Sequence, residues 1–112
     1  MIQATYAERG KILSLRVEGH ACYAEQGKDI ICASASILVG TVACYVKTAE
    51  EDGCLACEPT IIINEGYALI ECEPTEDDCE DMRKAYEFAT VGMQILENSH
   101  PKHIKLITYV EV

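Results

Sequence analysis

The chain has 112 residues, close to the commonest length of a single domain, and carries a formal net charge of −10. A surface with this acidic excess repels phosphate backbones, which argues against direct nucleic-acid binding; the charge either favours basic partners or only aids solubility. No run reaches the roughly 18 consecutive apolar residues of a membrane helix, and the first residues lack the features of a secretory signal. We therefore expect one domain over residues 1–112, in the cytoplasm, with no membrane contact.

The cysteine content also indicates a reducing compartment. The sequence holds seven cysteines, and an odd number cannot all pair within one chain. Most cysteines without disulfide partners behave as small buried hydrophobes. The set comprises Cys22, Cys32, Cys44, Cys54, Cys57, Cys72 and Cys79.

The first half of the chain predicts a hairpin followed by a helix. Apolar and polar residues alternate over residues 2–6 and 13–17, with a glycine-containing turn at 8–11. Residues 19–29 have neither a strand nor a helix period and are expected to form a loop. Residues 30–47 are nearly all apolar or small, which predicts a helix buried on all sides.

The second half repeats this order and adds a final strand. Residues 60–72 predict a hairpin with its turn at 64–66. Residues 75–78 resemble a capping box, and the apolar spacing of three and four that follows predicts a helix ending near Ser99. Alternation over residues 104–110 predicts a strand. The order ββαββαβ indicates an α+β fold, with both helices packed on a largely antiparallel sheet.

Cys32 is the residue best placed for chemistry, because it falls in the first turn of the predicted helix. The N–H groups and dipole at that end favour a thiolate, and the same N–H groups are available to bind an oxyanion. His20 lies twelve residues upstream, and an imidazole is the usual base for a cysteine nucleophile. Asp29 is either the N-cap of the helix or the group that orients the imidazole. The same pattern also fits an inert core cysteine.

The segment at residues 19–36 resembles the signature of the ribosomal-processing cysteine protease family. The sequence Gly-His-Ala at 19–21 matches a family motif after the second strand, and Asp-Ile-Ile-Cys-Ala-Ser-Ala-Ser at 29–36 matches the family's Asp-Ile-Val-Cys-Ala-x-x-Ser. Ile31 and Ser34 are minor departures from that pattern. The length and element order of the chain also fit the family.

The resemblance implies a cysteine endopeptidase that removes a short N-terminal extension from a large-subunit ribosomal protein. It places the catalytic roles on His20 and Cys32, with Gly19, Asp29 and Ser36 at supporting motif positions. It further implies a homodimer. We expect no cofactor and no metal. A different interpretation is a non-catalytic module that binds a ribosomal protein.

Two further features involve thiols. Cys22, two residues after His20, is either an inert loop thiol or a redox-sensitive partner that forms a disulfide with Cys32. Cys54 and Cys57 have the CxxC spacing of metal or redox sites, so a metal- or redox-active cysteine protein is a third interpretation. A single CxxC pair has too few ligands for a zinc site, which favours incidental thiols.

Overall fold

The computed structural model describes residues 1–25 and 29–111, and its elements follow the predicted order ββαββαβ. The strands are β1 (Ile2–Arg9), β2 (Ile12–Glu18), β3 (Thr60–Asn64), β4 (Tyr67–Cys72) and β5 (Ile104–Glu111). The helices are α1 (Ile30–Glu51), the short 3₁₀ helix η1 (Glu76–Asp78) and α2 (Cys79–Ser99).

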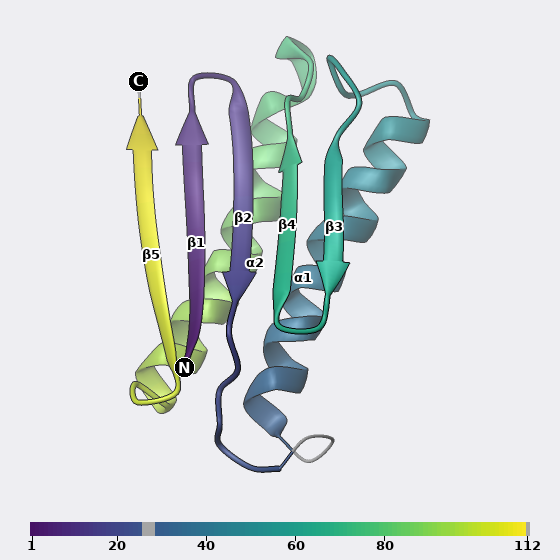
Figure 1. Cartoon of the computed structure of the whole chain (residues 1–112). Helices are drawn as coiled ribbons and strands as arrows, with labels where there is room; N and C mark the ends of the chain where they lie inside the picture. Colours follow the sequence, from purple (N-terminus) through teal and green to yellow (C-terminus); the bar gives the residue numbers. More distant parts are fainter. Residues whose placement is uncertain (26–28, 112) are drawn as a thin grey trace.

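The five strands form one sheet in the order β3-β4-β2-β1-β5. Every neighbouring pair is antiparallel except β1 and β5, which are parallel. Both helices cover the same face of this sheet (Figure 1). The prediction of an α+β fold with a largely antiparallel sheet is therefore confirmed.

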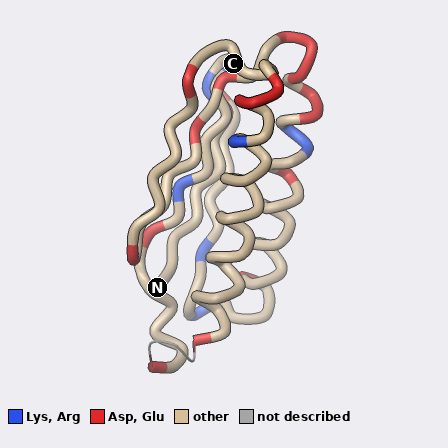
Figure 2. The backbone as a smooth tube through the Cα atoms, turned by 90° about the vertical axis from the view of Figure 1, so that its right-hand side faces the viewer, with Lys and Arg blue, Asp and Glu red and all other residues tan. Residues whose placement is uncertain are grey.

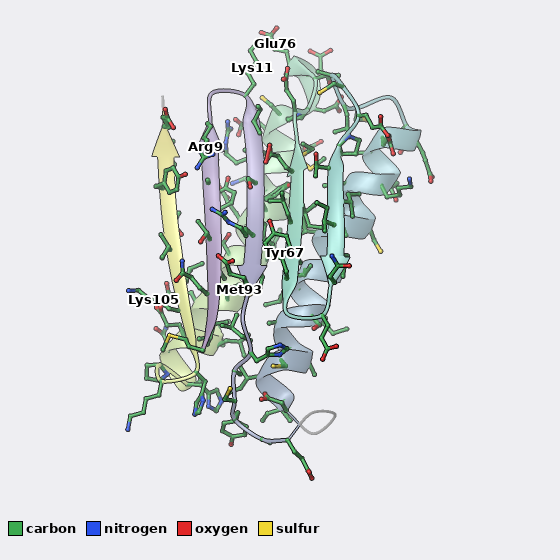
Figure 3. The ribbon with its side chains drawn as sticks, in the orientation of Figure 1. Arg9, Lys11, Tyr67, Glu76, Met93 and Lys105 are labelled. Atoms are coloured by element: carbon green, nitrogen blue, oxygen red, sulfur yellow. The ribbon has the colours of Figure 1, made fainter. Side chains whose placement is uncertain are left out.

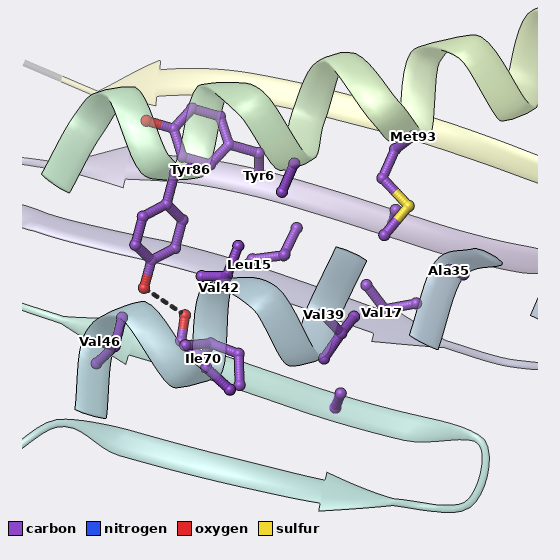
Figure 4. Close-up of a cluster of buried hydrophobic side chains, with 14 of the residues drawn as sticks. Tyr6, Leu15, Val17, Ala35, Val39, Val42, Val46, Ile70, Tyr86 and Met93 are labelled. Carbon is purple, nitrogen blue, oxygen red and sulfur yellow. Dashed lines mark hydrogen bonds between the residues drawn. The ribbon is translucent and has the colours of Figure 1, made fainter. Parts of the chain in front are cut away.

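The core lies between the sheet and the two helices. From α2, Tyr86 and Met93 are fully buried, and the Tyr86 hydroxyl donates a hydrogen bond to the carbonyl oxygen of Ile70 at 3.0 Å (Figure 4). Burial raises the pKa of Tyr86, so this hydroxyl stays protonated and remains a donor. The bond ties the middle of α2 to β4, whose other end leads into the turn beside the candidate site.

Helix α1 differs from its prediction in its burial: it runs to Glu51 and is buried along one face only. Ile37 and Tyr45 are exposed, because helices in a single layer on a sheet leave their outer side uncovered. The buried face consists of Ile31, Ala35, Val39, Val42, Ala43, Val46 and Ala49.

The expectation that no segment resembles a membrane helix does not hold for α1. By length and composition α1 is apolar enough to span a membrane. The core helix of a water-soluble protein meets the same criteria, and the buried face of α1 packs into the hydrophobic core of this fold.

The predicted capping box also forms differently. The Thr75 hydroxyl donates to the Asp78 carboxylate at 2.5 Å and caps no backbone N–H group. A 3₁₀ turn therefore precedes α2, which begins at Cys79.

The elements that carry the candidate site meet at one end of the molecule. The N-terminus, the end of β2, the start of α1 and the β3–β4 turn lie at that end (Figure 1). Lys11 and Glu76 lie at the opposite end (Figure 3).

Candidate active site

The chain leaves the sheet at Gly19 in a conformation that requires glycine. Its φ is +95°, and a Cβ atom there would collide with the backbone carbonyl oxygen of Met1. The Gly19 N–H group donates to the carbonyl oxygen of Gly66 in the β3–β4 turn at 2.9 Å. His20 follows directly and is exposed to solvent. The backbone of Met1 and the backbone of Gly66 thus fix the position of Gly19, and with it the position of the His20 backbone.

Cys32 is the third residue of α1, as predicted, and its side chain is half-buried. The backbone N–H group of Ala21 donates to its Sγ atom at 3.4 Å. A donor directed at the sulfur and the helix N-terminus beneath it both favour negative charge there. The loop residue next to His20 therefore touches the candidate nucleophile.

Asp29 joins the loop to the helix through four backbone N–H groups. Its Oδ1 atom accepts from Ile31 and Cys32, each at 3.0 Å. Its Oδ2 atom accepts from Tyr23 at 3.0 Å and Ala24 at 3.3 Å. The N-cap prediction is confirmed. Both carboxylate oxygens are used in this way, and the described residues include no hydrogen bond between Asp29 and His20.

These bonds correct one expectation about the helix N-terminus. The N–H groups of the first helical turn were expected to be available to an oxyanion, but Asp29 Oδ1 already accepts those of Ile31 and Cys32. Instead, the N–H group of Ala21 is directed at Cys32 Sγ, the candidate reacting atom.

Two histidines that sequence reasoning left without a role hold the same loop. The His103 Nδ1 atom donates to the carbonyl oxygen of Ala21 at 2.8 Å. The Tyr23 ring makes edge contacts with the His100 and His103 rings, each with centroids 5.3 Å apart. In the sequence, the signal for these contacts was Tyr23, an aromatic residue in the loop that carries the candidate base, since functional contacts concentrate in loops.

The candidate residues line one cavity of about 670 Å³. His20, Cys32 and Ser36 contribute to its wall, and Ser36 lies about one helical turn after Cys32. Residues 63–68 of the β3–β4 hairpin form another wall. Cys22 also lines the cavity, and all seven cysteines are free thiols in this structure.

The imidazole and the thiol share this cavity without a direct bond. Among the described residues no hydrogen bond joins His20 to Cys32 Sγ; the sulfur accepts from Ala21, and the ring lies against Gly66. Catalytic hydrogen bonds are commonly long or absent before substrate binds. The arrangement brings an imidazole and a thiol into one cavity, which supports nucleophilic chemistry.

The CxxC pair lies outside this cavity. Burial raises the pKa of Cys54, and nearby Asp78 acts in the same direction, which disfavours a reactive thiolate. Across residues 1–25 and 29–111, no cluster of three or more His, Cys, Asp or Glu side chains is arranged to hold a metal ion. The structure gives no support to the metal- or redox-active interpretation.

The hydrogen bonds of Asp29 also determine its ionisation. The Cys32 N–H group is the largest influence that lowers the pKa of Asp29, and the three other N–H groups add to it, while burial opposes them. A carboxyl with a depressed pKa stabilises the fold fully above its unfolded value, near ~3.9. That contribution is lost only as the pH falls through the lower pKa of the folded state.

We predict that Asp29→Asn and Asp29→Ala will separate the two roles of this carboxylate. An asparagine oxygen still accepts from Ile31 and Cys32, but its NH₂ group cannot accept from Tyr23 and Ala24. Amide hydrogen exchange measured by NMR should therefore speed up about tenfold or more at Tyr23 in both variants, because a charged acceptor is lost. Exchange at Cys32 should speed up in Asp29→Ala alone. Unchanged exchange at Tyr23 in Asp29→Asn would show that the carboxylate does not hold the loop.

Comparisons with known proteins find relatives that match most of the chain. The family model described as "Cysteine protease Prp" matches residues 1–105. The chain is 34% identical over 91 residues to the ribosomal processing cysteine protease Prp of Mycoplasma genitalium, an alignment that covers 80% of this chain and 82% of that protein. It is 32% identical to the protein of that name from Bacillus subtilis, with 98% of this chain and 99% of the relative covered.

Solved structures show the same fold. The crystal structure of an essential ribosomal processing protease Prp from S. aureus, in complex with a covalently linked product peptide, superposes with a TM-score of 0.76 at 22% identity. The match covers 97% of this chain and 100% of that one.

Proposed function

The chain belongs to the cysteine protease Prp family, and we propose that it removes a short N-terminal extension from a large-subunit ribosomal protein during ribosome maturation. One observation of this structure carries the proposal. His20 and Cys32 line a single cavity in which Sγ lies at a helix N-terminus and accepts a backbone N–H group. Residues 1–112 would then act as one protease domain.

In the proposed reaction Cys32 is the nucleophile and His20 is the base. The imidazole takes the thiol proton, and Sγ attacks the scissile carbonyl carbon. The tetrahedral intermediate collapses to a thioester when His20 returns the proton to the leaving amine. His20 then takes a proton from water, whose oxygen attacks the thioester and expels the Cys32 thiolate. The proton on His20 returns to that thiolate, and the product leaves as a carboxylic acid that loses its proton to solvent.

Other groups at the site would support these steps. The Ala21 N–H group is directed at Sγ, from where it would also reach an oxyanion formed on the attacked carbonyl. Ser36 offers a hydroxyl to the bound peptide from the cavity wall. Gly19 and Asp29 hold the loop that carries His20. No step requires a metal or an organic cofactor.

The charge of the protein suits the proposed substrate. The chain carries 19 acidic and 9 basic residues, and ribosomal proteins are typically basic because they bind RNA. Acidic positions gather at the end of the molecule where the C-terminus lies, and others occur near the site (Figure 2). Electrostatic attraction would therefore speed the encounter, and ribosome maturation implies a cytoplasmic location.

Cleavage of the extended ribosomal protein tests the assignment. Wild type should remove the extension, whereas Cys32→Ala and His20→Ala should each lose about 10³-fold or more in kcat/KM, because either loss disables the nucleophile. Cys44→Ala, which alters an exposed thiol elsewhere on α1, is the matched control and should cleave normally. Cleavage by Cys32→Ala at the wild-type rate would exclude this mechanism. A Cys22→Ala arm separates the loop thiol from the nucleophile.

We also propose that the protein is a homodimer that pairs through its outer helical face. Ile37 and Tyr45 of α1 and Phe88 and Ile95 of α2 are exposed there, and Phe88 keeps 78% of its surface accessible. Apolar side chains gathered on one face mark association surfaces.

The mass of the protein in solution tests this dimer. Light scattering should give the mass of two chains for wild type, whereas Phe88→Glu should dissociate at concentrations where wild type stays paired. Val110→Glu, an exposed apolar position on β5, is the control and should remain dimeric. A monomeric wild type would contradict the proposal.

A further inference from the structure

Gly66 in the β3–β4 turn touches the imidazole of His20. A Cβ atom built on Gly66 would lie 2.9 Å from His20 Nε2, 3.4 Å from Cε1 and 3.6 Å from Cδ2. The first of these distances is shorter than real Cβ atoms tolerate, so the ring occupies space that any other residue at position 66 would fill. The turn and the candidate base are therefore fitted to each other.

The backbone fixes this contact from the other side. The pairing of β2 with β4 ends at Glu18 and Tyr67, and one further hydrogen bond joins Gly19 N–H to the Gly66 carbonyl oxygen at 2.9 Å. The residue that precedes His20 is thus bonded to the residue that its ring touches. The β3–β4 turn therefore holds the backbone before His20 and also contacts the end of the His20 side chain.

We propose that Gly66 is a positioning residue for His20, because the missing side chain at position 66 determines where the imidazole lies in the cavity that it shares with Cys32. The proposal rests on the role of His20 as base proposed above. It assigns the β3–β4 turn a function in proton transfer in addition to its place in the cavity wall.

The contact at Gly66 differs from the contact at Gly19, where glycine is needed for the fold. At Gly19 an added Cβ would meet backbone atoms of Met1, which cannot move without disturbing the sheet. At Gly66 the atom in the way is the far end of a flexible side chain, so a substitution displaces the imidazole at little cost to the fold. The backbone of Gly66, with φ +75°, remains accessible to asparagine.

Displacement of the ring should affect the chemical step more than substrate binding. His20 transfers protons in both halves of the proposed reaction, and a shift of about 1 Å in a catalytic group costs on the order of 10²-fold in rate. A loss in kcat with little change in KM is therefore the signature of positioning. A rise in KM with unchanged kcat would indicate a side chain that only obstructs the peptide.

Gly66→Asn tests the proposal, with Gly53→Asn as its matched control. Gly53 has the same φ of +75°, but an added Cβ there meets nothing within 4 Å. Gly66→Asn should lower kcat at least about tenfold with KM within about threefold, and shift the His20 limb of the pH–rate profile. Gly53→Asn should match wild type, and both variants should unfold at similar urea concentrations.

NMR of the His20 ring gives a readout that needs no activity. The Hε1 proton of His20 should show a nuclear Overhauser effect to the Gly66 Hα protons in wild type and in Gly53→Asn. In Gly66→Asn the His20 ring resonances should shift. If wild type fails to cleave the ribosomal protein, the proposed function is wrong, and these spectra still decide whether Gly66 positions the ring.

Three results would overturn the proposal. One is a Gly66→Asn protein whose His20 resonances are unchanged, and another is a displaced ring with kcat at the wild-type value. The third is a Gly66→Asn protein that fails to fold, while Gly53→Asn folds, and is not rescued by adding His20→Ala, since this would give the glycine a purely structural role. If it unfolds, adding His20→Ala should restore folding only when the clash lies with the ring.

Discussion

The carboxylate of Asp29 is the interaction on which the candidate site depends. It accepts two N–H groups from the first turn of α1 and two from the loop that follows His20. Because the same side chain holds both segments, the helix that carries Cys32 and the loop that carries His20 keep one relative position. Four backbone donors also require the ionised form, since a protonated carboxyl loses an acceptor site.

Around that connection the loop is attached at several points along its described length. Gly19 is bonded to the β3–β4 turn, Ala21 contacts both Cys32 and His103, and Tyr23 packs between two histidines. The bonds to the first loop residues use backbone atoms, and the His20 ring itself lies against Gly66. A loop held in this way suits a base that serves both the thiol and a later water.

Much of the fold follows from local patterns in the sequence. Alternation located the strands, the glycine at 66 located a turn, and Asp29 was recognisable as a cap from its place before an apolar run. The complete burial expected for α1 was wrong, because composition does not reveal how many layers a fold has. Ile37 and Tyr45 are exposed only because nothing described covers the outer side of the helices.

The site itself was only partly predictable. His20 and Cys32 stood out from motif and spacing, but their neighbours come from segments distant in the sequence. Gly66 lies against a ring 46 positions earlier, and His103 bonds a residue 82 positions earlier. No local period encodes such contacts, so they appear only once strand pairing brings the turns to one end of the sheet.

The relative reactivity of the seven thiols tests the central claim most directly. Wild-type protein treated briefly with iodoacetamide near pH 6, then digested and analysed by mass spectrometry, reports the labelling of each cysteine. The account predicts that Cys32 is modified at least about tenfold faster than exposed Cys44 or Cys57, because thiolate character governs alkylation. Equal labelling of several exposed thiols, or Cys32 among the slowest, would contradict the assignment of Cys32 as nucleophile.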